Sequence, residues 1–459
     1  MKIPEILHKI SASLNSLDAK AIIVGGSVRD HFLELPIKDY DIEVYGLSSI
    51  DELETLLKKY GKVKLVGKSF GVLKFVHEKC EYDFSFPRRE TKNGVGHKGF
   101  DIISDGFMSF SEASKRRDFT INALGYEMQE GIFLDPFGGI SDLKQKKLKH
   151  VDDKTFIEDP LRVYRAVQFS ARFELSINKD TKKLCKSMVE NGDLEELPKE
   201  RIFEELKKLL LLADKPSVGF EIMREFGMLR YFPELKALID VQQEPKWHPE
   251  GDVWIHTMMC IDEMQGLFTG CPKRDLTLIL AVLCHDFGKP STTKLINGQI
   301  RALGHEDAGV EPTENFLKRL TNEVKLVESI LPLVKYHLSP SQLFSQNSSD
   351  KAIRRLSTKV NLEDLSLVAR ADFLGRTTEE SLTREYKAGD WLLQRASTLM
   401  VRKSPPKTLL QGRDLIALGY KPSKEFSKIL NSIYELQLEG VINSKDEAIK
   451  YLKKEKLCQ

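Results

Sequence analysis

The sequence lacks the features that mark membrane-bound and secreted proteins. No apolar run approaches the roughly 20 residues that a membrane-spanning helix requires. The first residues contain no apolar stretch followed by a cleavage site, so we expect no secretory signal. The six cysteines are scattered, without a Cys-x-x-Cys pair, which is typical of free thiols in a reducing compartment. These absences predict a soluble protein of the cytoplasm.

An excess of one charge and internal repetition are also missing. The 70 Lys and Arg residues nearly balance the 68 Asp and Glu residues, which leaves a formal net charge of +2. Near-neutrality does not exclude a nucleic-acid partner, because a local basic stripe is sufficient to bind one. No repeat of about 20–50 residues is apparent. At 459 residues, the chain is expected to divide into about three domains.

The most informative motif is a glycine turn followed by two aspartates one residue apart. Asp39 and Asp41 stand at i and i+2 of an expected strand, so their carboxylates point to the same side. Two hard oxygen ligands of this kind suit Mg²⁺. The glycines let backbone N–H groups approach an anion closely. The stretch predicts a strand at Ala21–Val24, a turn at Gly25-Gly26, a short helix from Ser27, a loop at Leu35–Lys38 and a strand at Tyr40–Tyr45.

Each part of this motif is common by itself. A Gly-Gly pair is usually only a turn, and Asp-x-Asp is often a solvated strand end. The order and the close spacing together favour a site that transfers a nucleotide from a triphosphate. Further along, Arg116 and Arg117 could grip phosphate, while Asp118 and Asn122 could hold a ribose hydroxyl. A helix start with surface arginines is the alternative for that segment.

Together these motifs resemble the class II tRNA nucleotidyltransferase/poly(A) polymerase family. They occur in the family's order over about residues 20–205: Gly25-Gly26-x-Val28-Arg29-Asp30, Asp39-x-Asp41, Arg116-Arg117-Asp118-Phe119-Thr120-x-Asn122-Ala123, Asp135-Pro136-x-Gly138-Gly139 and Glu158-Asp159-x-x-Arg162. The resemblance implies a polymerase-β-like head with a small mixed sheet, and catalytic, Mg²⁺-binding roles for Asp39 and Asp41. It also implies nucleotide-binding roles for Gly25, Gly26, Arg29, Arg117, Asp118, Asn122, Asp159, Arg162 and Arg165. Asp83 is a candidate third carboxylate or an ordinary strand-end residue.

In that family the Glu-Asp-x-x-Arg helix serves as a protein template for the incoming base. A carboxylate at Asp159 can accept from the exocyclic amine of cytosine or adenine, and Arg162 can donate to the neighbouring ring nitrogen. Uracil and guanine reverse this pattern and would leave buried polar groups unpaired, so we expect CTP and ATP to be selected. An ordinary helix start with an i,i+3 ion pair is the alternative.

The second half of the chain carries a separate set of metal-ligand residues. His256, the adjacent pair His285-Asp286, and Asp372 all lie in helical patterns. They resemble the ligand set of HD-domain phosphohydrolases over about residues 245–380, which implies one or two divalent ions on a helical bundle. His305 and His337 are suitably placed in the sequence to serve a second ion. We expect His248 to be a surface or packing histidine.

A head of this kind fused to an HD domain resembles the bacterial multifunctional CCA-adding proteins. The resemblance implies addition of CCA to tRNA from CTP and ATP, and phosphodiesterase or phosphatase activity of the HD part. We therefore expect an α+β chain with a nucleotidyltransferase head at 1–150 and a helical, templating and RNA-binding neck at 151–240. An HD domain at 241–400 and a C-terminal helical segment at 401–459 would follow. The body after the head is expected to be all-α.

Several alternatives remain open. The same chemistry would serve a poly(A) polymerase, or an enzyme that adds only CC or only the terminal A. Family members that switch from C to A use the loop expected at Arg88–Asp105, which looks mobile, and its length favours complete CCA addition. Two alternatives belong to other classes. One is an HD phosphohydrolase with a nucleotide-sensing head, which the intact Asp39 and Asp41 disfavour. The other is a non-catalytic RNA-binding scaffold. Nothing in the sequence indicates the oligomeric state.

Overall fold

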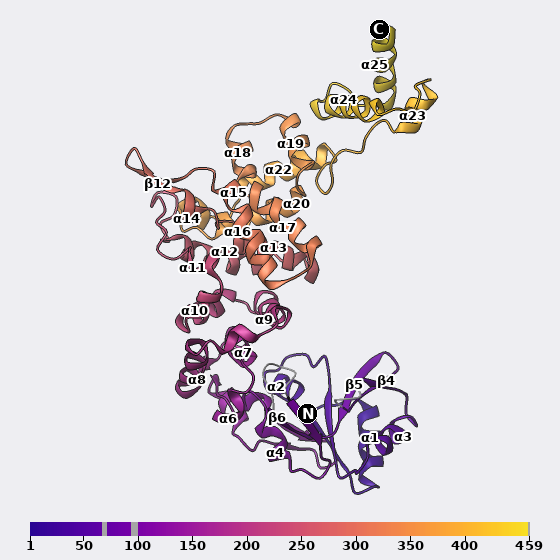
Figure 1. Cartoon of the computed structure of the whole chain (residues 1–459), viewed down its shortest axis with the longest axis vertical. Coiled ribbons are helices and arrows are strands. Elements are labelled where there is room, and N and C mark those ends of the chain that lie inside the picture. Colours follow the sequence, from indigo (N-terminus) through magenta and orange to yellow (C-terminus); the bar gives the residue numbers. More distant parts are fainter. Residues whose placement is uncertain (67–70, 93–99, 458–459) are drawn as a thin grey trace. The chain divides into compact units, whose positions relative to one another are not determined.

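The computed structural model describes residues 1–66, 71–92 and 100–457 (Figure 1). Contacts within the chain separate two compact units. The head unit comprises residues 1–213 with 218–228, and the body unit comprises residues 214–217 with 229–459. The head unit combines a mixed sheet with helices, whereas the body unit is helical apart from one hairpin.

The head unit is built on a seven-stranded sheet with the order β3-β4-β5-β2-β1-β8-β9. Its strands are β1 (Lys20–Val24), β2 (Asp41–Tyr45), β3 (Lys62–Val66), β4 (Val72–His77), β5 (Cys80–Ser85), β8 (Gly125–Glu127) and β9 (Ile132–Leu134). Strands β2 and β5 pair in parallel, and the other neighbours pair antiparallel. The mixed sheet expected for the head is therefore confirmed.

Burial explains the sequence patterns of the sheet. The unbroken apolar run from Ala21 to Val24 belongs to β1, whose four apolar residues are all buried because the strand lies between neighbours in the sheet. Strand β4 instead alternates, with Leu73 and Phe75 fully buried. The first helices complete the fold and contact the sheet: α1 (Glu5–Asn15), α2 (Gly26–Phe32) and α3 (Ile50–Leu57).

The segment expected to be a mobile loop is largely a β-ribbon. Strands β6 (Arg88–Lys92) and β7 (Phe100–Ser104) pair antiparallel as a separate two-stranded sheet. The expectation of a loop is wrong for these strands, because β6 is polar along its length and lacks the apolar alternation that identifies a strand from sequence. The expected mobility rested on Gly94, Gly96 and Gly99. These glycines belong to residues 93–99, which lie outside the described residues.

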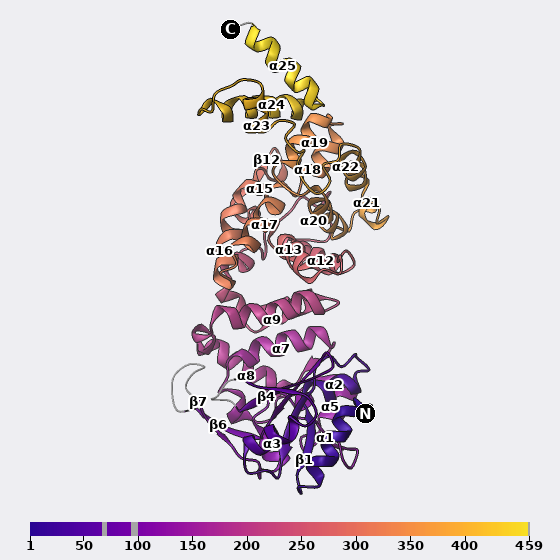
Figure 2. The same cartoon turned by 90° about the vertical axis from the view of Figure 1, so that its right-hand side faces the viewer.

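The remaining elements of the head unit are mainly helices. They are α4 (Phe110–Lys115), α5 (Gly139–Lys144), α6 (Asp153–Phe156), α7 (Leu161–Arg172), α8 (Lys179–Glu190), α9 (Lys199–Leu212) and α10 (Pro216–Glu225), with 3-10 turns η1 (Thr120–Asn122) and η2 (Asp193–Glu196). A short parallel pair joins β10 (Lys147–Leu148) to β11 (Ser176–Ile177). Helices α7 and α9 run side by side (Figure 2). The chain changes from one unit to the other after residues 213, 217 and 228, and the second of these changes lies within α10.

The body unit is organised around α13 (Pro272–Cys284). This helix is buried from Asp275 to Cys284, as expected for a helix that is apolar on nearly every side. Helices α12 (Val253–Gln265), α17 (Val324–Tyr336) and α20 (Leu362–Leu374) pack against it. Its other elements are η3 (Met228–Tyr231), α11 (Pro233–Lys236), α14 (Lys289–Thr292), α15 (His305–Ala308), α16 (Val310–Leu320), α18 (Ser339–Ser345), α19 (Asp350–Ser357), α21 (Glu379–Leu382), α22 (Lys387–Thr398), and the hairpin of β12 (Thr293–Ile296) with β13 (Gln299–Ala302).

The last helices of the body unit share a small core of their own. They are α23 (Gly412–Ala417), α24 (Glu425–Glu439) and α25 (Lys445–Leu457). Leu415, Ile433 and Leu452 are among the buried residues of this core. Ion pairs link α24 to α19, with Lys351 Nζ 2.6 Å from Glu439 Oε1. Among the described residues, no helix is both long and apolar enough to cross a membrane.

Candidate functional site

The glycine turn of the head unit brings the chain close to Arg117. Gly25 adopts a φ of +72°, a conformation that side chains disfavour. A Cβ at this position would lie 2.8 Å from Arg117 Nη1. The Gly25 amide donates to the carbonyl of Leu124 at 3.0 Å, which ties the turn to the segment that follows Arg117. The turn therefore joins two motifs that lie about a hundred residues apart in the sequence.

The three carboxylates singled out from the sequence gather at one end of strands β2 and β5. Asp41 and Asp83 are direct register partners in this parallel pair, and the amide of Asp83 donates to the carbonyl of Tyr40 at 3.1 Å. Asp39 lies two residues before the first residue of β2, outside the strand on which it was expected, and is exposed. Although the Asp41 side chain is exposed at the surface, desolvation by the protein around it raises its pKa; Arg117 opposes this rise, and the carboxylates of Asp83 and Asp39 add to it. Such crowding of negative charge is relieved by a bound cation, so the set fits a divalent ion.

A fourth carboxylate, which the sequence analysis missed, continues this row. Glu43 follows Asp41 by two residues on β2 and is buried, with 3% of its surface exposed. Its Oε1 accepts from Arg117 Nη2 at 3.0 Å and from Arg116 Nη2 at 3.4 Å, and its Oε2 accepts from the Tyr45 hydroxyl at 2.7 Å. Extending the two-residue period of Asp39 and Asp41 would have identified it. Glu43 anchors the arginine pair against the strand that carries Asp41.

Four of the predicted nucleotide-binding residues form one buried network. Asp118 Oδ1 accepts from Asn122 Nδ2 at 2.9 Å, and Asn122 Oδ1 accepts from Arg29 Nη1 at 2.7 Å. Asp118 Oδ2 accepts from Arg165 Nε at 2.6 Å. Although burial opposes ionisation, Arg165 and Asn122 hold the pKa of Asp118 below its ordinary value. In this structure these groups bind one another and connect α2 and η1 to α7, and their contacts with a nucleotide stay a prediction.

The predicted template residues lie at the start of α7. Asp159 Oδ2 accepts from Arg201 Nη2 at 3.0 Å, so α9 supplies an ion-pair partner that sequence spacing alone did not reveal. Arg162 donates to the carbonyl of Thr155 at 2.6 Å and to that of Arg116 at 2.5 Å. Because the Arg116 side chain also reaches Glu43 on β2, the template residues and the carboxylates at the end of β2 belong to one connected set of contacts.

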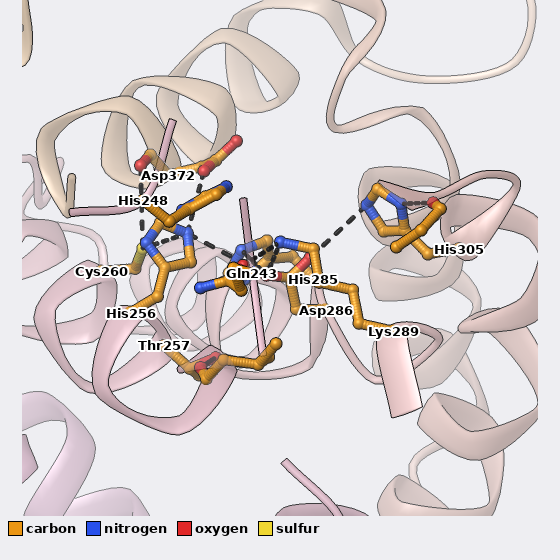
Figure 3. Close-up of polar contacts among 12 residues, drawn as sticks. Gln243, His248, His256, Thr257, Cys260, His285, Asp286, Lys289, His305 and Asp372 are labelled. Carbon is orange, nitrogen blue, oxygen red and sulfur yellow. Dashed lines mark hydrogen bonds and ion pairs between the residues drawn. The ribbon is translucent and has the colours of Figure 1, made fainter. Parts of the chain in front are cut away.

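The body unit brings together all six metal-ligand residues expected from the sequence. Asp286 lies between the others (Figure 3), with Oδ2 3.2 Å from His285 Nε2 and Oδ1 3.5 Å from His305 Nε2. On one side His256 Nε2 lies 3.1 Å from Asp372 Oδ1, and on the other His305 Nε2 lies 3.4 Å from His337 Nε2. The set therefore divides into two groups that Asp286 joins.

Hydrogen bonds on the far side of each ring fix which nitrogen faces the centre. The Nδ1 atoms of His285, His305 and His337 lie 2.6 Å, 2.7 Å and 2.7 Å from backbone carbonyls. A carbonyl can only accept, so each Nδ1 carries the proton and each Nε2 presents a lone pair. This is the arrangement in which proteins hold histidines as metal ligands.

The inward-facing atoms repel one another unless a cation lies between them. The Nε2 lone pairs of His305 and His337 face each other at 3.4 Å. Among the described residues, His285 Nε2 and one carboxylate oxygen of Asp286, Oδ1, are buried without a hydrogen-bond partner. Ligands about 2.0–2.2 Å from one ion stand roughly 3 Å apart, which is close to the distances found. The donor set therefore fits one or two divalent ions.

Three charged residues that the sequence analysis did not name support this centre. Glu250 Oε1 accepts from His256 Nδ1 at 2.8 Å, which directs His256 Nε2 inward. Lys289 Nζ lies 2.6 Å from Asp286 Oδ2, and Arg376 Nη2 donates to both oxygens of Asp372 at 2.9 Å. Arg376 follows Asp372 by four residues and lies just beyond the end of α20, a spacing that could have identified it. Glu250 lies in a loop, where no periodicity points to a partner.

Two further contacts shape the centre. Cys260 Sγ, one helical turn after His256, lies 3.4 Å from His256 Nε2. A Cβ on Gly288 would lie 2.0 Å from the carbonyl of His305, so glycine at this position allows the two segments to approach closely. His248, expected to be a surface or packing histidine, is half-buried, and its Nδ1 lies 2.9 Å from Glu250 Oε1.

We expect Glu250→Gln to weaken metal binding in the body unit. The amide removes the charge that orients His256, and losing such a partner typically lowers metal affinity about 10- to 100-fold. Competition with a chromophoric chelator measures this affinity directly. Glu263→Gln is the matched control, because Glu263 lies on α12, the helix that carries His256, but pairs with the exposed Arg384. Equal affinities in the two variants would contradict the role of Glu250.

The sheet with its carboxylates defines a nucleotidyltransferase-type head, and the helical body carries a cluster of histidines and aspartates that fits divalent ions. Residues 21–149 match the family of the poly A polymerase head domain. Residues 174–239 match the family described as the probable RNA and SrmB-binding site of polymerase A.

Curated relatives and solved structures extend this similarity along the chain. The multifunctional CCA protein of Acinetobacter baylyi is 37% identical over 328 residues, which cover 70% of this chain and 75% of that protein. That of Mannheimia succiniciproducens is 34% identical over 389 residues, covering 82% of this chain and 89% of that protein. The crystal structure of the Bacillus stearothermophilus CCA-adding enzyme in complex with CTP shares the fold, with a TM-score of 0.68, 20% identity and 100% coverage of both chains.

The chain belongs to the tRNA nucleotidyltransferase/poly(A) polymerase family, in which its curated relatives are multifunctional CCA proteins. Nucleotidyltransferases of this family use a divalent metal ion, usually Mg²⁺.

Proposed function

We propose that this chain adds CCA to the 3′ end of tRNA from CTP and ATP, without a nucleic-acid template and with release of pyrophosphate. The observation that carries the proposal is the set of contacts in the head unit. Arg162 binds the backbone of Arg116, whose side chain reaches Glu43, two residues beyond Asp41. Arg162, which we propose reads the base, is thereby linked to the strand that carries Asp41, and this supports selection of a nucleotide without a nucleic-acid template.

In the reaction, the 3′-hydroxyl of the RNA attacks the α-phosphate of the incoming nucleotide. Asp39 and Asp41 would hold Mg²⁺, which polarises the reacting phosphate and neutralises charge on the leaving group. Asp83, the register partner of Asp41, would complete the carboxylate set. Their placement at the end of a central strand keeps the carboxylates in fixed positions, which favours catalysis because little reorganisation is needed.

Recognition of the base falls to Asp159 and Arg162. The Asp159 carboxylate would accept from the exocyclic amine of cytosine or adenine, and Arg162 would donate to the adjacent ring nitrogen. In the structure these side chains bind Arg201 and two backbone carbonyls. A nucleotide would therefore replace protein partners with equivalent hydrogen bonds, which lowers the cost of leaving these groups buried before it binds.

The remaining head residues would bind the sugar and the phosphates. We propose that Gly25 and Gly26 admit the triphosphate and that Arg117 contacts it. Asp118 and Asn122 would hold the ribose, with Arg29 and Arg165 fixing their positions through the hydrogen bonds already described. These roles agree with the burial of Asp118 and Asn122, which have 6% and 5% of their surfaces exposed.

Product sequencing tests the proposal. The purified chain is incubated with tRNA that lacks its 3′ end, Mg²⁺ and the nucleoside triphosphates, singly and mixed. Incorporation of C, C and then A supports CCA addition. Tails of A with indefinite length would instead identify a poly(A) polymerase, and products ending after CC, or extended only by A, a partial enzyme. No incorporation at all would leave an HD phosphohydrolase with a nucleotide-sensing head, or a scaffold.

We further propose that the body unit is a metal-dependent phosphodiesterase or phosphatase. His256, His285, Asp286 and Asp372 would hold one divalent ion, and Asp286, His305 and His337 a second. When bound, the metal would polarise the phosphoester and make a bound water more acidic. Lys289, 2.6 Å from Asp286 Oδ2, would offset the charge of that carboxylate. Release of phosphate from nucleoside 2′-phosphates, or opening of 2′,3′-cyclic phosphates, tests this activity, and failure with both would contradict it.

We propose that the chain has the four functional regions expected from the sequence. They are the head at 1–150, the neck at 151–240, the HD domain at 241–400 and the C-terminal segment at 401–459. We also propose a cytoplasmic location. The described cysteines are free thiols, which agrees with a reducing compartment.

A further inference from the structure

A second, larger cavity adjoins the metal centre of the body unit. The cavity at the metal centre has a volume of about 240 Å³ and is lined by Asp286, His305 and His337, among others. The neighbouring groove has a volume of about 900 Å³. Trp247 and Arg376 line both, as does Leu338. A molecule held at the metal centre can therefore extend into the groove.

The two volumes suit different parts of one ligand. Pockets that enclose drug-sized molecules measure roughly 300–1,000 Å³. The metal cavity, at about 240 Å³, is below this range and accommodates a phosphate with its ions and water. The groove lies near the upper end of the range. A phosphoester bound at the metal centre would place its larger organic part in the groove.

The groove wall presents an exposed indole at the junction. Trp247 lies in the loop before α12 and has 53% of its surface exposed, although tryptophan is usually well buried. Lys246 Nζ lies 5.0 Å from the centre of the Trp247 ring and covers one face of it. Phe344, which is 41% exposed, lines the same groove. Planar bases stack on aromatic side chains of this kind.

Positive charge at the junction favours an anionic ligand. Lys246 and Lys387 line the groove, and Arg376 lies where the groove and the metal cavity share their walls. Among the described residues, Arg376 Nε is buried without a hydrogen-bond partner. The acidic residues Glu379 and Glu380 also line the groove, so the cationic side chains do not form a general polyanion-binding surface. They favour one phosphate beside one planar group.

We propose that this groove is a nucleoside subsite in which Trp247 stacks against the base of the phosphoester whose phosphate lies at the metal centre. The inference rests on the hydrolase activity proposed for the body unit and identifies Trp247 as the residue that selects phosphoesters with a base. Phosphorylated sugars and other phosphoesters without a base would bind through the metal centre alone.

Kinetics with paired substrates test the subsite. Adenosine 2′,3′-cyclic phosphate carries a base, whereas glycerol 1,2-cyclic phosphate offers the same reacting ring without one. Since stacking on an aromatic side chain is worth about 1–3 kcal/mol per base, Trp247→Ala should raise KM for the adenosine ester about 5- to 150-fold. The value for the glycerol ester should change less than about twofold. Trp247→Phe should restore most of the affinity. Ile416→Ala, at a residue that is also 53% exposed, is the control.

Fluorescence titration tests the same subsite without turnover. Of the three tryptophans, Trp254 is fully buried, so an exposed Trp247 should report stacking. Adenosine 2′-monophosphate should quench the emission of the wild-type chain but not that of Trp247→Phe, and inorganic phosphate should quench neither. No quenching of the wild-type chain, or equal KM changes for both esters, would overturn the subsite. Quenching without hydrolysis of either ester would uphold the subsite and contradict only the proposed hydrolase activity.

Discussion

Asp41→Asn is expected to abolish nucleotide addition, with a loss of at least about 10³-fold in rate, because a metal ion contributes several kcal/mol of charge stabilisation. The substitution keeps the shape of the side chain but removes the charge. It also removes a charge that is desolvated and that lies near the carboxylates of Asp83 and Asp39, the two effects that raise the pKa of Asp41, so the fold should be retained. The measurement is incorporation of radiolabelled CMP into tRNA that lacks CCA.

Two controls distinguish this loss from general damage. Asp51→Asn changes an exposed carboxylate in the first turn of α3 and should leave incorporation unchanged. Asp41→Asn itself should retain phosphoester hydrolysis by the body unit. If the variant incorporates CMP within tenfold of the wild-type rate, Asp41 is not a catalytic ligand. If it loses hydrolysis as well, the two activities do not have separate sites.

Asp286→Asn is expected to have the opposite effect. Asp286 lies between both groups of histidines, at 3.2 Å from His285 and 3.5 Å from His305. A neutral amide there should reduce bound metal to a small fraction of the wild-type amount and lower hydrolysis at least about 100-fold, since both ions would lose a charged ligand. Elemental analysis of the purified chain measures the metal, and nucleotide addition should stay at the wild-type rate.

Because Asp286 is buried, its replacement could disturb the body unit. Thermal melting of the metal-free wild-type chain and variant separates the two effects. Asp307→Asn is the matched control, since this carboxylate lies nearby on α15 but is exposed and pairs with Lys335. A variant of Asp286 that keeps its metal content and its hydrolysis would contradict the proposed centre.

The parts that the sequence predicted best are those in which local spacing dictates geometry. Asp39 and Asp41 were grouped because residues two apart on a strand share a side. Strand β2 begins only at Asp41, so Asp39 lies before the strand, and what the spacing predicted correctly is that the two carboxylates are near each other. The adjacent His285-Asp286 was identifiable because two ligands at the end of one helix must lie close together. The helical body was expected from the helical patterns in which His256, His285-Asp286 and Asp372 lie.

The parts that were missed depend on contacts between distant segments. Arg201 meets Asp159 only because α9 packs beside α7, and no spacing in the sequence relates them. Glu250 reaches His256 from a loop. Strand β6 pairs with β7 through its backbone while its side chains are polar, so composition suggested a loop instead. Such contacts arise from tertiary packing, which overrides local propensity.

The most direct test of protein-directed base selection is the ratio of kcat/KM for CTP to that for UTP in Arg162→Ala. If Arg162 reads the ring nitrogen of the base, this ratio should fall at least about 100-fold, because sites that pair buried polar groups with a ligand discriminate by large factors. A variant that uses CTP normally and still rejects UTP completely would show that the base is selected elsewhere.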